Sequence, residues 1–137
     1  MIEIKANLDE LKSVVDRLKD LIEQKKIVLL LGTLASGKTT FVKEYAFTLG
    51  IKDSITSPTF SLVQNYSDKI SHYDIYNSSF EKFMELGFFE ELENGQIHFI
   101  EWADEKLISM LDMYGFDYLK IEIEVLKNER IYKVSNE

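Results

Sequence analysis

An apolar run followed at once by a glycine-rich stretch constrains this chain more than any other part of its sequence. The run KIVLLL, residues 26–31, is apolar after its lysine and β-branched at its start, which is typical of a central strand covered on both faces. The stretch GTLASGKT, residues 32–39, comes next. Residues 38–49 then space their apolar side chains as a helix does, and Gly50 is a common helix stop. Strand, glycine-rich turn and helix form the context in which the pattern G-x-x-x-x-G-K-[ST] binds phosphate.

The residue types in this stretch suit phosphate binding. Glycine permits positive φ, so consecutive N–H groups can turn inward around phosphate oxygens, and the N-terminus of the next helix adds partial positive charge. We expect Lys38 to reach the outer phosphates of a nucleotide and the Thr39 hydroxyl to occupy one position on an octahedral Mg²⁺. The alternative is a structural turn with an incidental lysine. The residues of this stretch expected to bind the nucleotide are Gly32, Ala35, Ser36, Gly37, Lys38, Thr39 and Thr40.

Composition limits what such a motif can belong to. The chain has 137 residues, 45% of them hydrophobic, and we expect residues 1–137 to form a single domain with its own core. The net charge is −8, from 24 acidic and 16 basic side chains without a basic patch, which disfavours direct binding of nucleic acid. The absence of cysteine excludes disulfides and thiolate metal sites. With no signal-peptide pattern and no apolar run of about 20 residues, we expect a cytoplasmic protein without a membrane segment.

Helical and strand patterns alternate along the rest of the chain. An amphipathic helix is predicted over residues 7–24, with Asn7 and Glu10 as its N-terminal cap. Two more helical segments are predicted at residues 79–92, with a break at Gly87, and at residues 103–113. Strands are predicted at residues 60–66, 69–76 and 96–101, and in a hairpin of residues 118–126 and 129–134 joined by Lys127-Asn128.

This mixture of elements predicts an α/β fold. We expect a three-layer sandwich like that of P-loop NTPases, with a mostly parallel central sheet and a C-terminal antiparallel hairpin. The order of the strands in the sheet stays open at this point.

Two carboxylates stand where predicted strands end. Asp74 lies in HYDIY and Glu101 ends IHFIE, and ligands of α/β sheets gather at the carboxyl ends of the strands. Asp74 could instead face outward from an alternating strand, and Glu101 could cap the next helix. His72 would share a face with Asp74, and we interpret it as an ordinary strand histidine rather than a catalytic base. Thr59, in SPTF, is a candidate switch residue touching Mg²⁺ or the γ-phosphate; an ordinary Ser-Pro turn is the alternative.

Five motifs, GTLASGKTT, SPTFSLVQNY, HYDIY, LGFFEEL and IEWAD, occur in this order and resemble the bacterial TsaE (YjeE) family over nearly the whole chain. The resemblance implies a small ATPase, binding ATP and Mg²⁺, that is required for threonylcarbamoyladenosine modification of tRNA. It implies TsaD and TsaB as partners, with tRNA reached only through their complex. Lys38 matches the family's P-loop lysine, Thr39 and Glu101 its Mg²⁺ ligands, and Asp74 the aspartate beside the phosphates. Lys38 and Asp74 are therefore the expected catalytic residues, and Arg130 matches an arginine near the nucleotide.

Three positions depart from the family pattern. Thr33 and Ala35 stand where the family loop has an acid or asparagine and a glycine, and Asn77 stands where arginine is common. Alanine tolerates positive φ less well than glycine, so we expect a stiffer loop. Asn77 carries no charge, so it does not replace that arginine as a cation.

Other classes of nucleotide-binding protein fit less well. A GTPase needs N-K-x-D and D-x-x-G motifs, and the sequence has neither. A small kinase of a metabolite, the main alternative, needs an arginine-rich lid, whereas Arg17 and Arg130 are the only arginines. A nucleotide-dependent binding module without catalysis is the third possibility. Because fast hydrolysis generally needs an arginine at the transferred phosphate, we expect slow ATPase activity that partner proteins raise.

Overall fold

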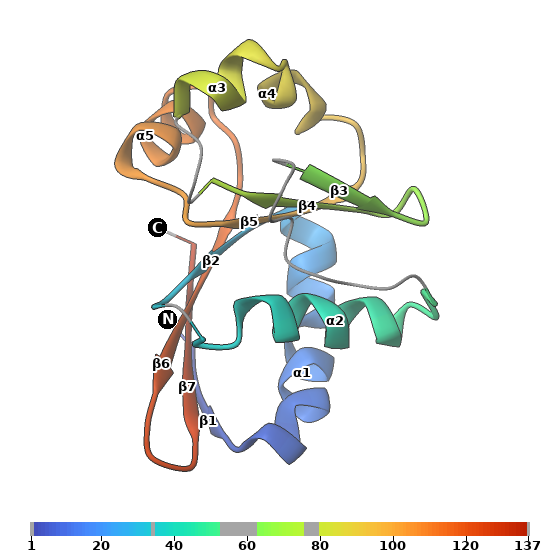
Figure 1. The fold of residues 1–137 in the computed structure, drawn as a ribbon, viewed down its shortest axis with the longest axis vertical. Coiled ribbons are helices and arrows are strands. Elements are labelled where there is room, and N and C mark those ends of the chain that lie inside the picture. The colour runs from blue at the N-terminus through green and yellow to red at the C-terminus, as the bar shows by residue number, and fades with distance from the viewer. Residues whose placement is uncertain (1, 34, 53–62, 76–79, 137) are drawn as a thin grey trace.

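The computed structural model describes residues 2–33, 35–52, 63–75 and 80–136. Within these ranges seven strands form one sheet in the order β1-β7-β6-β2-β5-β4-β3 (Figure 1). The strands are β1 (Ile2–Ala6), β2 (Ile27–Leu31), β3 (Val63–Tyr66), β4 (Ile70–Asp74), β5 (Ile97–Glu101), β6 (Leu119–Val125) and β7 (Arg130–Ser135). The neighbouring strands β6, β2, β5 and β4 are parallel, whereas β3, β7 and β1 pair antiparallel with their neighbours. The mostly parallel centre and the closing β6–β7 hairpin are as predicted.

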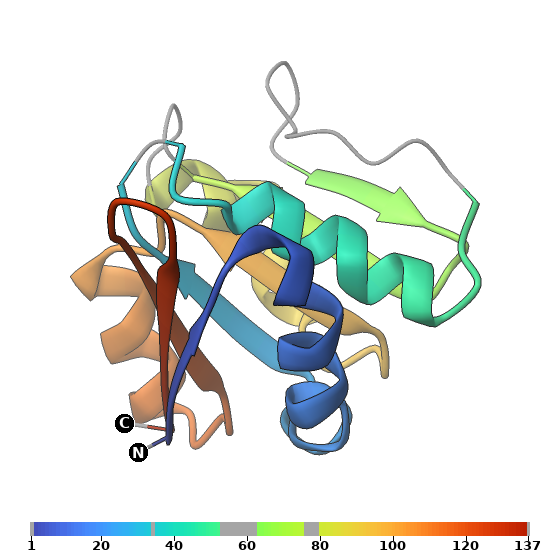
Figure 2. The same ribbon diagram turned by 90° about the horizontal axis from the view of Figure 1, so that it is seen from below.

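Helices cover both faces of this sheet (Figures 1 and 2). The 3-10 turn η1 (Leu8–Glu10), α1 (Leu11–Lys25) and α2 (Lys38–Thr48) lie on one face. The other face carries α3 (Phe80–Glu85), α4 (Phe88–Glu91) and α5 (Glu105–Met113). Helices, sheet and helices make the three layers that the sequence predicts.

Strand β2 lies at the centre of both cores. Val28 and Leu30 pack with α1 and α2, whereas Ile27 and Leu29 pack with the helices of the opposite layer. All four side chains are almost fully buried. Alternate residues of a strand face opposite sides of a sheet, so a strand buried on both sides must be apolar without interruption. This explains the continuous run IVLLL.

Local signals in the sequence set several helix ends. Asn7 accepts a hydrogen bond from the Glu10 backbone N–H, and the Glu10 carboxylate accepts one from the Asn7 N–H. The predicted capping pair therefore forms, but it caps the 3-10 turn η1 that leads into α1, and α1 itself begins at Leu11. Gly87 has a φ of 77° and separates α3 from α4, as predicted. At the start of α5 the Asp104 carboxylate accepts from the Leu107 N–H at 2.9 Å. Asp104, and not Glu101, therefore caps this helix.

Residues 2–6 carry no element among those predicted from sequence, yet they form the edge strand β1. The strand pairs antiparallel with β7, with Ile4 opposite Tyr132. Only Ile4 and Ala6 are buried, so the segment offers a weak alternating pattern, and its partner lies at the far end of the chain. In the described part of the chain, no helix has the length and apolar character needed to span a membrane.

His98 is buried on β5, facing the layer of α3 to α5. Its Nδ1 lies 2.9 Å from the Tyr73 hydroxyl and its Nε2 lies 2.9 Å from the Asn94 side-chain oxygen. Burial lowers the pKa of His98 to about 4 and raises that of Tyr73 to about 12. The ring is therefore neutral at pH 7, with Nε2 donating to Asn94 and Nδ1 accepting from Tyr73.

This histidine predicts acid sensitivity of the fold. Its pKa is lower in the folded chain than the ordinary value of about 6.5, so the unfolded chain binds more protons and stability falls as the pH drops from about 6.5 to about 4. Between pH 7.5 and 5.0, wild type should lose about 2 kcal/mol more free energy of unfolding than His98→Gln. Urea denaturation at the two pH values measures this, and the other titrating groups cancel in the comparison. Equal losses in both proteins would contradict the assignment.

Candidate functional site

Several elements bring their ends together at one edge of the sheet. The glycine-rich loop, residues 32–37 (described except for residue 34), leaves the carboxyl end of β2 and leads into α2. Asp74 and Glu101 are the last residues of β4 and β5 and stand opposite each other in the parallel register. Glu101 also pairs with Leu30 at the end of β2. The sequence expectation that both acids end strands parallel to β2 is confirmed.

The backbone of the loop takes positive φ at three described positions. Gly32, Ala35 and Gly37 have φ values of 147°, 62° and 105°. A side chain at Gly32 would meet the Ser36 Oγ at 2.6 Å and the Ile123 carbonyl oxygen at 2.8 Å, so only glycine fits there. Ala35 holds a conformation that favours glycine, at the position where the TsaE pattern has one.

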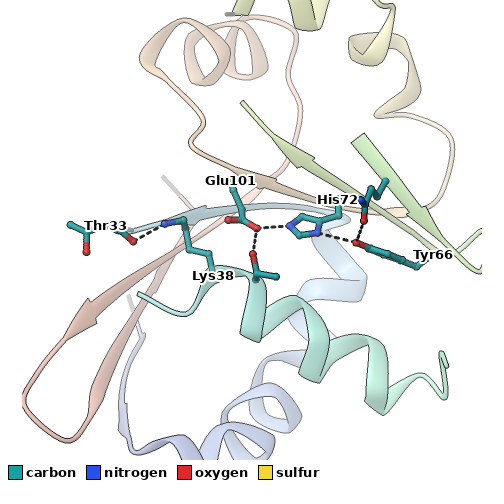
Figure 3. Close-up of polar contacts among 7 residues, drawn as sticks. Thr33, Lys38, Tyr66, His72 and Glu101 are labelled. Atoms are coloured by element: carbon teal, nitrogen blue, oxygen red, sulfur yellow. Dashed lines mark hydrogen bonds and ion pairs between the residues drawn. The ribbon is translucent and has the colours of Figure 1, made fainter. Parts of the chain in front are cut away.

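Lys38, the first residue of α2, folds back over this loop. Its Nζ donates to the carbonyl oxygen of Thr33 at 2.8 Å (Figure 3) and to that of Gly32 at 2.8 Å. It also lies 4.2 Å from the centre of the half-buried Trp102 ring. The side chain is 5% exposed. Burial lowers the pKa of Lys38, and the charges of Glu101 and Asp74 oppose this shift. The lysine is therefore held by carbonyl oxygens, an aromatic face and two nearby carboxylates.

Two side chains contact one oxygen of the Glu101 carboxylate. The Thr39 hydroxyl donates to Oε2 at 2.9 Å, and His72 Nε2 also contacts Oε2 (Figure 3). Glu101 and His72 are both buried. Thr39 and Glu101, which the resemblance pairs, are therefore brought together. The sequence interpretation of His72 as an ordinary strand histidine does not anticipate this contact; its position two residues before Asp74, on the same face of β4, is the signal that could have found it.

Arg130 reaches the loop from the β6–β7 hairpin. Its Nε donates to the Ser36 carbonyl oxygen at 3.1 Å, and its Nη1 to the Glu129 carbonyl oxygen at 3.3 Å. The Ser36 hydroxyl itself is buried and has no hydrogen-bond partner among the described residues. Thr40 is exposed on α2. Thr59 and Asn77 lie outside the described residues.

A family profile matches almost the whole chain. The family described as "Threonylcarbamoyl adenosine biosynthesis protein TsaE" matches residues 5–132. The tRNA threonylcarbamoyladenosine biosynthesis protein TsaE of Treponema pallidum is 41% identical over 97 residues, which are 69% of this chain and 71% of that protein. The protein of the same name from Rickettsia conorii is 42% identical over 101 residues, 70% of this chain. These 101 residues span only 57% of the Rickettsia protein.

A solved structure shares the fold. The crystal structure of YdiB from Bacillus subtilis superposes with a TM-score of 0.66, covering 99% of this chain and 86% of that one. Sequence identity between the two is 22%, so the likeness concerns the fold alone.

The close contacts at Gly32 predict a position-specific effect on stability. Gly32→Ala and Gly115→Ala both place a side chain at positive φ, but Gly115 has no atom near the added carbon, whereas Gly32 has two within 2.8 Å. We expect Gly32→Ala to lower the free energy of unfolding by about 1 kcal/mol or more beyond Gly115→Ala. Urea denaturation followed by circular dichroism compares the two variants. Equal destabilisation by the two substitutions would show that the loop accommodates the added side chain at Gly32 with no further loss of free energy of unfolding.

Proposed function

The chain belongs to the TsaE family, and from this membership and the site we propose that it is a Mg²⁺-dependent ATPase acting in threonylcarbamoyladenosine modification of tRNA. The observation that carries the proposal is the meeting of Lys38, Thr39 and Glu101 beside a loop with positive φ. We further propose that residues 1–137 act as one P-loop domain, in the cytoplasm, where tRNA is modified. Because the matched region spans little more than half of the Rickettsia relative, activity, substrate and partners are all part of the proposal.

The chemistry of the site suits a nucleotide and Mg²⁺. Gly32 leaves no room for a side chain, so the loop backbone itself would line the phosphates. The Ser36 hydroxyl, buried and without a described partner, is suited to a phosphate oxygen. Mg²⁺ prefers oxygen ligands and is usually held by one or two protein groups together with substrate phosphates and water. Thr39 and Glu101 offer such oxygens 2.9 Å apart.

Each site residue has a distinct part in this proposal. Bound Mg²⁺ would neutralise charge on the phosphates during their hydrolysis. Lys38 would exchange its two loop carbonyls for phosphate oxygens, keeping its charge in a buried place. Asp74, beside Glu101 at the sheet edge, would orient the attacking water. Arg130, fixed on the Ser36 carbonyl, would lie near the nucleotide at the outer side of the loop. We keep Thr59 as a proposed contact to the nucleotide.

Few cations are available for the developing charge on the transferred phosphate. Arg17 is exposed on α1, and Arg130 is bonded to backbone carbonyls. An arginine in this role contributes about 10³- to 10⁵-fold to the rate. We therefore propose slow hydrolysis by the chain alone and stimulation by a partner, for which the family implies TsaD and TsaB.

The distribution of charge supports a protein partner with a basic face. Residues 80–118 contain ten acidic and two basic side chains, and the rest of the chain has fourteen of each, so the net charge of −8 arises in this one segment. The acidic side chains here, apart from Glu101, are exposed. Leu86, Met113 and Tyr114 are exposed in the same layer, at 51%, 75% and 63%. An acidic layer with apolar side chains repels tRNA and suits a basic protein surface.

Loss of the Lys38 charge should weaken binding of the triphosphate. We expect Lys38→Ala to reduce ATP affinity by about 2–3 kcal/mol, because a charge-assisted contact is removed. Isothermal titration with Mg-ATP measures this. Lys43→Ala, which removes the same charge from an exposed position on α2, is the matched control. Unaltered affinity in Lys38→Ala would show that the loop is only structural.

The partner proposal predicts how ATP turnover responds to added components. Steady-state ATPase activity should be very low for the chain alone and with tRNA alone, and should rise with TsaD and TsaB. Glu85→Lys with Glu93→Lys should reduce this stimulation, since both exposed acids lie in the acidic layer. Asp9→Lys with Asp20→Lys changes the charge equally on the opposite face and should leave it intact. Rapid turnover by the chain alone, or stimulation by tRNA alone, would contradict the proposal and favour a kinase or an RNA-dependent ATPase.

A further inference from the structure

We propose that His72 is a positioning residue of the nucleotide site, holding the Glu101 carboxylate in place for a divalent cation. The inference rests on the proposed function, because it assigns His72 a part in Mg²⁺-dependent nucleotide binding. It goes beyond the resemblance, which points to Lys38, Thr39, Asp74 and Glu101.

Three elements converge on one carboxylate oxygen. Thr39 comes from α2, His72 from β4 and Glu101 from β5, and both donors meet at Oε2 (Figure 3). An ionised carboxylate only accepts hydrogen bonds, so His72 Nε2 is protonated and donates the hydrogen bond to Glu101. A carboxylate buried as deeply as this one needs such donors to offset its lost hydration.

The two donors differ in what else they do. Thr39 is itself a proposed ligand of Mg²⁺, so its hydroxyl oxygen would be shared between the cation and the carboxylate. His72 is fully buried and has no such second task, so its contact can hold Glu101 with or without a cation. Hydrogen bonds to ligating carboxylates orient them, and losing such a partner typically costs about 10- to 100-fold in metal affinity.

The surroundings of His72 fix its ring. Tyr66, on the neighbouring strand β3, is buried, and its hydroxyl lies 3.5 Å from His72 Nδ1. The same hydroxyl donates to the Gln64 side-chain oxygen at 2.6 Å, and Gln64 stands opposite His72 in the strand register. The ring is thus set between β3 and the carboxylate.

The other histidine of the chain is the natural comparison. His98 is equally buried on the adjacent strand, but it contacts Tyr73 and Asn94, which are neutral, in the opposite core. A histidine that only fills a core should behave like His98. One that positions Glu101 should alter cation dependence when replaced.

Trp102 fluorescence offers a direct binding readout. It is the only tryptophan, it follows Glu101, and its ring lies against Lys38 Nζ. ADP binding to the full chain can be followed by this signal while MgCl₂ is titrated. The variants are His72→Leu, which removes the donor, His72→Gln, whose terminal amide can reach where Nε2 lies, and His72→Asn, which is one methylene shorter. His98→Leu is the control.

We expect His72→Leu and His72→Asn to raise the MgCl₂ concentration for half-maximal ADP binding by about 10- to 100-fold. His72→Gln should stay near wild type, and His98→Leu should lower the urea midpoint without changing the MgCl₂ midpoint. If His72→Leu does not fold, the comparison of the MgCl₂ midpoints of His72→Gln and His72→Asn tests the inference. An unaltered MgCl₂ midpoint in His72→Asn, or a midpoint in His72→Gln raised as much as in His72→Asn, would overturn the role of His72 and leave the proposed function standing. Absence of any ADP response in wild type would overturn the proposed function with it.

Discussion

The parallel pairing of β2 with β5 is the constraint on which the rest of this structure depends. β2 has neighbours on both sides and helices on both faces, so its side chains are buried in two cores at once. Parallel strands present their carboxyl ends at the same edge, and this puts the glycine-rich loop after β2 directly beside Glu101 at the end of β5. A shift of register by one residue would turn Glu101 to the opposite face of the sheet.

Burial governs the electrostatics at this edge. Lys38, Glu101 and His72 are all removed from water, and each has partners that offset the cost: loop carbonyls for the lysine, the Thr39 hydroxyl and His72 for the carboxylate. These contacts hold the side chains in place, because breaking one would leave an unpaired polar atom buried in a low-dielectric site, which costs free energy. The same effect supports the proposal that this edge of the sheet binds phosphate and a cation, whose charges would complement those of the buried groups.

The two helical layers differ in charge as well as in position. The face of α1 and α2 supports the loop, whereas residues 80–118, which build most of the opposite layer, carry all of the net negative charge. Much of that segment lies between Asp74 and Glu101 in the sequence. The acidic layer is therefore connected directly, through the chain, to the strands that end in these two carboxylates. A partner bound there would lie close in the chain to the groups that we propose for catalysis.

Local features of the sequence determined much of this protein. These features are the apolar run of β2, the glycines of the loop, the Asn7–Glu10 cap and the break at Gly87. Each depends on residues only a few positions apart in the sequence, so each can be predicted without knowledge of the tertiary structure. Lys38 and Thr39 were predicted from the pattern G-x-x-x-x-G-K-[ST], Asp74 and Glu101 were predicted from strand-end positions, and all four match the resemblance. Only the tertiary structure decided that β1 pairs with β7, that His72 meets Glu101 across 29 positions, and that Arg130 reaches Ser36 across 94. These contacts depend on strand order and register, which a periodic pattern does not encode, because every strand of the same hydrophobic alternation could pair with many others.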